Sequence, residues 1–182
     1  RLRAVGYPRL ESHFMPERAE PLPPRVEAAL KGRKRREIIL FLTGFHLANY
    51  TRQDLFVAAD LDAENRIDEL LEAVELSKRL RLAWTQTIRV LARDNADLLV
   101  VLKKHPAERA EDYQELDEVP GVLVVSESFD IQAIVSRCGL FLHYGSTALM
   151  DAHLAEVPSV YLHASNNESC AWYTDMGWPS TR

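Results

Sequence analysis

Cysteine is scarce in this chain of 182 residues, which contains only Cys138 and Cys170. The two do not form a C-x-x-C pair or a cluster with histidines, and no H-E-x-x-H pattern occurs elsewhere. Disulfide frameworks and zinc sites are therefore disfavoured, and we expect no protein-bound metal. A reducing compartment is the corresponding expectation.

Long apolar runs are also missing, because none approaches the roughly 18 residues that a membrane-spanning helix needs. We expect a cytoplasmic protein, either free or peripheral at the inner face of the membrane. The sequence begins with Arg-Leu-Arg rather than with Met, and we expect it to be one domain of a longer protein.

Positive charge is not in excess, since 22 lysines and arginines stand against 27 acidic residues, a net charge of −5. No nucleic-acid partner is expected for such a chain. The basic run KGRKRR at residues 31–36 is an exception. We interpret it as a solvated linker or domain edge rather than as a nucleic-acid or lipid patch.

Glycine-rich phosphate loops are absent as well. After the first predicted strand the sequence reads LTGFHL (residues 42–47), which lacks two of the three glycines of a dinucleotide fingerprint. No Gly-Lys-Ser/Thr run of a P-loop occurs. Nicotinamide cofactors and P-loop chemistry are therefore disfavoured, and no cofactor is expected.

What is present is a series of short apolar segments rich in β-branched residues, typical of strands buried on both faces. They cover residues 37–45, 98–102, 122–125, 140–143 and 159–162. Helical patterns are predicted at residues 62–93, 107–116, 130–137, 148–156 and 169–176, with one or two turns at 26–30. The alternation predicts an α/β fold, a doubly wound, Rossmann-like parallel sheet of about five or six strands. Residues 1–36 are predicted to be an entry linker and residues 37–182 the domain.

Polar residues cluster where the predicted strands end. They are Thr43-Gly44, His105-Pro106, Ser126-Glu127 and Gly145-Ser146-Thr147. In doubly wound sheets, ligands bind beyond the carboxyl ends of the strands. A purely structural sheet would not need these residues at its strand ends, so the pattern predicts a ligand site at this edge.

The turn at Gly145 has two interpretations. Free backbone N–H groups, two hydroxyls and the start of a helix suit an anionic group, most often phosphate. Ser146 or Thr147 could equally be only a helix N-cap. Structural interpretations apply to other positions too: His105 as a turn residue, His143 as a buried core histidine and Glu108 as a first-turn helix acid favoured by the helix dipole.

Two motifs carry a resemblance to a known family. Lys104-His105-Pro106-x-Glu108 follows one predicted strand, and His143-Tyr144-Gly145-Ser146-Thr147 follows a later one. In this order they resemble the nucleotide-binding C-terminal half of GT-B glycosyltransferases, over residues 6–158. The likeness is greatest to bacterial enzymes of surface-polysaccharide synthesis that use CMP-activated sugars, the Kdo transferases and polysialyltransferases.

The resemblance implies a donor site. In those families a His-Pro motif contacts the nucleotide and a Ser-Ser or Ser-Thr motif contacts its phosphate. It therefore implies that His105 with Pro106 contacts the nucleotide, and that Ser146 and Thr147, beside Gly145, hold the phosphate.

Two further strand ends and one helix residue complete the implied site. Thr43 and Gly44 would approach the phosphate or sugar, and Ser126 and Glu127 would lie near the base. Asp151 stands where many GT-B enzymes have a ribose-binding glutamate, which is one methylene longer.

The resemblance also implies partners. These are a CMP-sugar donor, a saccharide acceptor and a missing N-terminal GT-B domain that would supply the general base. Three alternatives stay open: a CDP-glycerol-type glycerophosphotransferase, a UDP-sugar epimerase of the GT-B fold and a non-catalytic assembly module.

Overall fold

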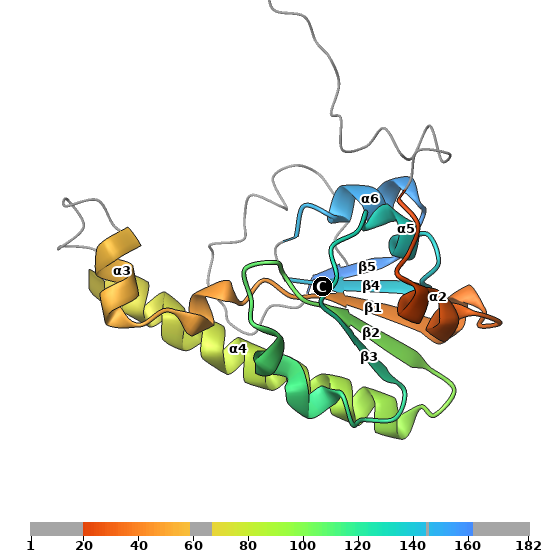
Figure 1. Ribbon diagram of the computed structural model, residues 1–182, viewed down its shortest axis with the longest axis horizontal. Coiled ribbons are helices and arrows are strands. Elements are labelled where there is room, and N and C mark those ends of the chain that lie inside the picture. Colours follow the sequence, from red (N-terminus) through yellow and green to blue (C-terminus); the bar gives the residue numbers. More distant parts are fainter. Residues whose placement is uncertain (1–19, 59–66, 145, 162–182) are drawn as a thin grey trace, which may run out of the picture.

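The computed structural model describes residues 20–58, 67–144 and 146–161. Its centre is one sheet of five parallel strands in the order β3-β2-β1-β4-β5 (Figure 1). The strands are β1 (Ile38–Leu42), β2 (Leu99–Lys103), β3 (Val122–Val125), β4 (Leu140–His143) and β5 (Ser159–Tyr161). The predicted parallel sheet and its five strands are thus confirmed.

Strand β1 lies in the middle of the sheet. Its residue Leu40 pairs with Val101 of β2 on one side and with Phe141 of β4 on the other. The chain moves outward from β1 to β3, then returns to place β4 beside β1. The strand order therefore reverses between β1 and β4, the switch point at which open α/β sheets bind ligands.

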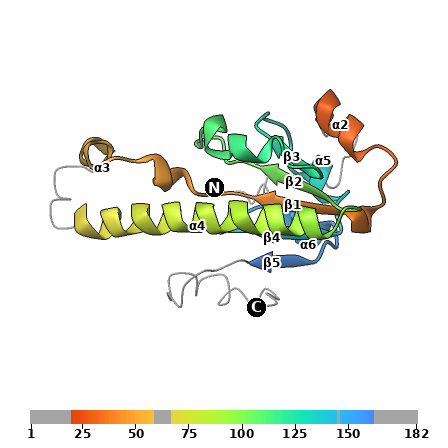
Figure 2. The same ribbon diagram turned by 90° about the horizontal axis from the view of Figure 1, so that it is seen from below.

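Helices cover both faces of the sheet (Figures 1 and 2). One face carries α2 (Pro24–Leu30), α5 (Gln132–Val135) and α6 (Leu149–Leu154). The other carries α4 (Ile67–Asp94) with the 3-10 helices η4 (His46–Asn49) and η6 (Ala110–Leu116). Helix α3 (Arg52–Ala58) packs on α4, and η3 (Arg35–Glu37) precedes β1. The fold is therefore doubly wound, as predicted.

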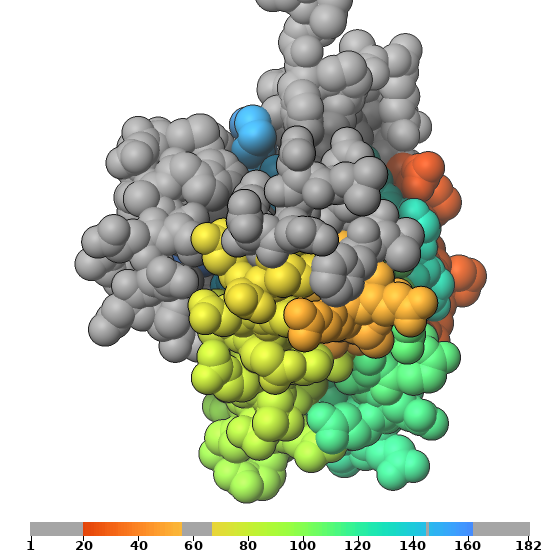
Figure 3. Space-filling model, turned by 90° about the vertical axis from the view of Figure 1, so that its left-hand side faces the viewer, coloured from red at the N-terminus to blue at the C-terminus, as the bar shows by residue number. Residues whose placement is uncertain are grey.

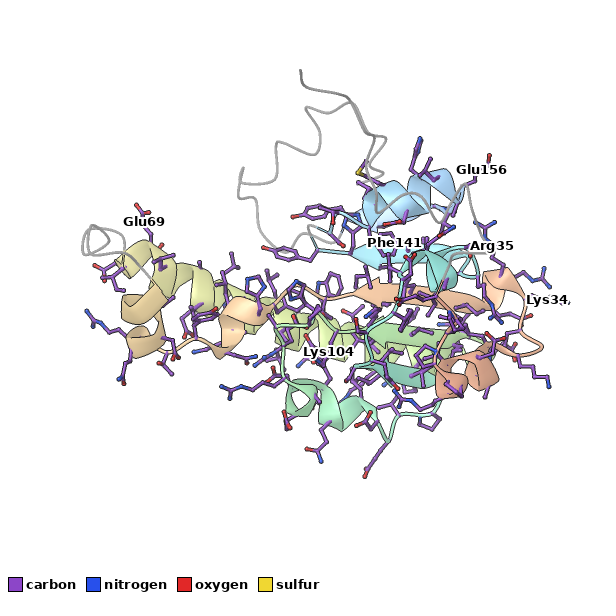
Figure 4. All side chains as sticks on the ribbon, turned by 45° about the horizontal axis from the view of Figure 1, so that its top comes forward. Lys34, Arg35, Glu69, Lys104, Phe141 and Glu156 are labelled. Atoms are coloured by element: carbon purple, nitrogen blue, oxygen red, sulfur yellow. The ribbon has the colours of Figure 1, made fainter. Side chains whose placement is uncertain are left out.

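The two faces of β1 supply two separate cores. Leu40 packs toward α5 and α6, in the same core cluster as Phe141, which is labelled in Figure 4. Phe41 packs toward α4 on the opposite face. On the α4 side, the Trp84 ring meets Phe41 and Phe45 edge-on, with centroids 5.4 and 5.2 Å apart. Strands buried on both faces need this apolar composition, which is why they were recognisable in the sequence.

Several predicted boundaries were wrong. The strand predicted to reach residue 45 ends at Leu42, because Thr43 and the Phe45 amide turn to a side-chain acceptor. The α-helix predicted at 107–116 is a 3-10 helix that starts at Ala110, since Arg109 is extended. The helix after β4 is shorter than predicted and ends at Leu154, two residues before Glu156 turns to a φ of 53°. The helix predicted at 169–176 lies outside the described residues.

Helix α2 belongs to the same packed body as the sheet. Val26 and Leu30 are 0% and 1% exposed and lie in the core cluster with Leu40 and Val135. The domain division at residue 36 remains a prediction. Within the described ranges, no helix combines the length and apolarity needed to cross a membrane.

Candidate functional site

Three turns follow β1, β2 and β4 at the carboxyl edge of the sheet. Because these strands are parallel neighbours, their ends lie side by side. The turns after β2 and β4 are two strand spacings apart, about 10 Å. Figure 3 looks onto this side of the molecule, where the η4–α3 segment lies between α4 and the green residues around η6. The sequence prediction that the His105 and Ser146 turns share one edge is therefore met by the topology.

The turns after β1 and β4 approach each other closely at Gly44. A Cβ atom at this position would lie 3.2 Å from the carbonyl oxygen of Tyr144, a tight contact with backbone. The Tyr144 ring lies 5.3 Å from that of Phe45. Glycine is therefore what allows the two turns to meet across the switch point.

The turns after β1 and β2 are joined by the carboxylate of Glu108. Its side chain is buried, with 3% exposure. It accepts hydrogen bonds from the Thr43 hydroxyl and the Phe45 amide on one side. On the other side it accepts the His105 amide at 3.0 Å and the Tyr113 hydroxyl at 3.1 Å. Four donors from three segments therefore converge on one carboxylate.

The interpretation of Glu108 as a first-turn helix acid was wrong. The next helix, η6, begins only at Ala110, so Glu108 precedes it. Its side chain is buried beneath the two turns rather than exposed to solvent. Helical periodicity carries no signal for such a residue, because Glu108 lies in a turn. Its place three residues after His105, with a hydroxyl at the end of β1, was the available clue.

His105 presents its imidazole at this edge. Its Nδ1 accepts the Ala107 amide at 3.1 Å, so Nε2 carries the proton of the neutral ring. Partial burial and the neighbouring His46 lower the pKa of His105. A neutral donor at neutral pH is therefore the form available to a ligand.

His46 was missed in the sequence as a site residue. Its ring lies 5.3 Å from that of His105, at an interplanar angle of 32°. Among the described residues, its buried Nδ1 has no hydrogen-bond partner. The pairing joins β1 and β2 turns that are 59 positions apart in sequence, so no local pattern could have revealed it.

The Ser146 turn leads into α6, whose N-cap is Ala148 and has no side-chain capping bond. The Ser146 hydroxyl accepts the Ala148 amide at 3.2 Å, and the Ser146 amide donates to Nδ1 of His143 at 3.4 Å. Thr147 is exposed, and Gly145 lies outside the described residues. Helix α6 has only six residues, so its dipole adds little. The Ser146 hydroxyl therefore closes the turn before α6 without being its N-cap, and a phosphate contact by Ser146 or Thr147 remains a prediction.

His143 is the buried core histidine that the sequence suggested. It is 2% exposed and stacks on Phe141 with ring centroids 5.1 Å apart. Burial lowers its pKa to about 4. It supports the Ser146 turn from below and does not face a ligand.

The turn after β3 is held by an ion pair. Glu127 accepts from Arg25 at 3.1 Å and from the Ser126 amide at 3.0 Å. Its backbone carbonyl accepts Nζ of Lys103 at 3.1 Å. The turn lies at the same edge, two strands from β1, and the role of Ser126 and Glu127 near a base remains a prediction.

Asp151 lies beneath the surface. Its side chain in α6 is 0% exposed, so a ribose hydroxyl could reach it only if the covering residues moved. Its predicted contact remains a prediction. Within the described part of the chain, no three His, Cys, Asp or Glu side chains gather as metal ligands would.

Comparison with known proteins finds no matching family model and no matching curated protein. Two solved structures are similar in fold. One is the UDP-GlcNAc 2-epimerase of Methanocaldococcus jannaschii in complex with UDP-GlcNAc and UDP, at 10% identity and a TM-score of 0.48. The other is KpsC of Thermosulfurimonas dismutans, a beta Kdo 2,4 transferase, at 14% identity and a TM-score of 0.40.

These matches cover 86% and 85% of this chain but only 36% and 41% of those proteins. The chain therefore spans less than half the length of either. The fold assignment rests on the strand order and on the two packed faces of this chain itself.

Proposed function

We propose that this chain is the donor-binding domain of a GT-B glycosyltransferase. The donor would be a CMP-sugar, and the transferred sugar one such as Kdo or sialic acid. The product would be a bacterial surface polysaccharide. The acceptor and the general base would bind and act through an N-terminal domain outside this sequence.

The observation that supports the proposal most is the meeting of three polar turns at the switch point. The His105 turn follows β2 and the Ser146 turn follows β4, on either side of β1. The Thr43-Gly44 turn lies between them. A nucleotide with its phosphate would suit this arrangement, because His105 and the hydroxyls of Ser146 and Thr147 offer donors at one edge, on either side of the β1 turn.

The chemical role follows from charge. Transfer of the sugar leaves CMP, whose phosphate gains negative charge as the glycosidic bond breaks. The Nε2–H of His105 and the hydroxyls of Ser146 and Thr147 are donors that would stabilise this charge. A carboxylate in the missing domain would take the proton of the acceptor hydroxyl. We therefore expect the 182-residue chain to bind nucleotide weakly and to catalyse no transfer alone.

Isothermal titration calorimetry with CMP, CDP, UMP, UDP and GDP tests the proposal. CMP should bind with the highest affinity. The variants His105→Ala and Ser146→Ala should each weaken binding by about 1–3 kcal/mol, since each loses a hydrogen bond to a charged group. His153→Ala and Ser136→Ala are matched controls. His153 lies in the last turn of α6, and Ser136 directly follows α5. Both residues are exposed, so their substitution should leave the affinity for CMP unchanged.

Other outcomes point to the alternatives. A preference for UDP over CMP would favour a UDP-sugar epimerase, and turnover of CDP-glycerol by the full-length protein would favour a glycerophosphotransferase. Absence of binding at millimolar nucleotide, with native circular dichroism, would favour a non-catalytic assembly module. Transfer catalysed by the isolated chain would contradict the division of labour proposed above.

A further inference from the structure

The buried carboxylate of Glu108 has no part in the roles assigned so far. We propose that Glu108 is the positioning residue of the nucleotide site. Its carboxylate holds the His105-Pro106 turn and the Thr43-Gly44 turn in the one relative position in which both contact the donor. The inference rests on the proposed function, because it concerns the same site.

The contact lies where the sheet ladder stops. The last ladder-type bond between the two segments runs from the Thr43 amide to the Lys103 carbonyl, at 3.2 Å. Beyond it the two turns diverge, and no strand pairing can fix their separation. There the Phe45 amide and the His105 amide both donate to Glu108 instead. The carboxylate therefore continues the connection between the two turns beyond the end of the ladder.

The bridge includes the hydroxyl of Thr43 itself. This hydroxyl donates to Glu108, and its oxygen also accepts the His105 amide at 3.0 Å. One predicted sugar or phosphate contact and one predicted nucleotide contact are thereby bonded to each other and both to Glu108. A shift of the carboxylate would move both.

The contacts of the site require two acceptor oxygens on a side chain of this length. A carboxylate offers only acceptors: Oε1 accepts from the Phe45 amide, and Oε2 accepts from the Thr43 and Tyr113 hydroxyls and from the His105 amide, which the Thr43 oxygen shares. A glutamine would turn an NH₂ group toward amide N–H groups, leaving buried donors unpaired. An aspartate keeps the charge but is one methylene too short to reach both turns.

A second carboxylate nearby provides the matched control. Asp112 accepts from Asn49 at 2.7 Å and pairs with Arg81 at 2.9 Å. It ties η4 and α4 to η6, but it does not contact Thr43 or His105. Loss of Asp112 should therefore weaken the fold without displacing the two turns.

The test compares Glu108→Gln, Glu108→Asp and Asp112→Asn with the unmodified chain, by CMP calorimetry below each variant's unfolding temperature. Both Glu108 variants should raise the CMP Kd about tenfold or more. Asp112→Asn should unfold at lower temperature and keep the CMP Kd within about twofold. Unchanged affinity in a folded Glu108 variant would overturn the inference and leave the proposed function standing.

A second measurement needs no variant. On titration of the ¹⁵N-labelled chain with CMP, the amide resonances of Phe45 and His105 should shift together, with the calorimetric Kd. If CMP binds while both amides stay unmoved, Glu108 does not link the ligand to the turns. If the unmodified chain binds none of the nucleotides, the proposed function itself fails, which is a distinct result.

Discussion

The Ser146 amide donates a hydrogen bond to Nδ1 of the buried His143, with 3.4 Å between the two nitrogens. The bond needs Nδ1 unprotonated, so it fixes the neutral form of the ring with its proton on Nε2. It links the last residue of β4 to the turn that precedes α6. The pH dependence of stability should therefore report on this turn.

Burial lowers the pKa of His143 from 6.5 to about 4. Between these values the unfolded chain binds a proton that the folded chain does not, so stability falls as pH falls from about 6.5 to 4. The expected loss from this group is about 3 kcal/mol. Urea unfolding of the chain and of His143→Gln, at pH 7 and pH 4.5, measures it. The variant should lose less stability over this interval; equal losses would mean that His143 does not titrate in it.

Trp84 should carry a large share of the stability of the α4 face. It is 4% exposed and contacts Phe41 and Phe45 with its ring edge-on. Trp84→Ala should lower the free energy of unfolding by about 3–5 kcal/mol. Leu82→Ala on the same helix, at a residue 57% exposed, should change it by less than about 0.5 kcal/mol. A comparable loss in both variants would contradict a dominant contribution from the aromatic contact.

The strands and the ligand edge could be predicted from the sequence, because strands buried on both faces must be apolar. Because all the strands run parallel, the residues that follow β1, β2 and β4 must lie at the same edge of the sheet. The shared edge of Thr43, His105 and Ser146 could therefore be predicted from the sequence, whereas their contacts with a nucleotide remain predictions. The closeness of Gly44 to Tyr144 could not be predicted, because it depends on the distance between two turns.

Glu108 and His46 could not be placed from the sequence for the same reason. An acid after a His-Pro turn looks the same whether its carboxylate faces solvent or a neighbouring turn. Only the fold brings the Phe45 amide to it. The boundary errors share this cause, since side-chain acceptors end β1 and delay η6 where propensity predicted continuation.

The Arg81–Asp112 pair is a tertiary contact whose value can be measured. Its side chains are 20% and 14% exposed, and Asn49 contacts both. Asp112→Asn should cost about 1–3 kcal/mol, because the guanidinium keeps its partial burial and its bond to Asn49 but loses its charged partner. The exposed pair Arg89–Glu115, at 43% and 47%, is the control. Glu115→Gln should cost less than about 1 kcal/mol in urea unfolding; the reverse ranking would contradict the account.

Cys138 should be chemically inert in the folded chain. The residue is fully buried and its thiol donates to the Val135 carbonyl at 3.1 Å. Burial raises the pKa of the thiol to about 12. Since the thiolate is the nucleophile, the reactive fraction at pH 8 is about one in ten thousand, and access is blocked as well. In a Cys170→Ser chain, a thiol reagent such as DTNB should therefore label Cys138 only as fast as the protein unfolds, and at once in concentrated urea. Labelling in native buffer at the rate of a free thiol would mean that the layer between α5 and β4 opens readily, which would conflict with the packing of that face.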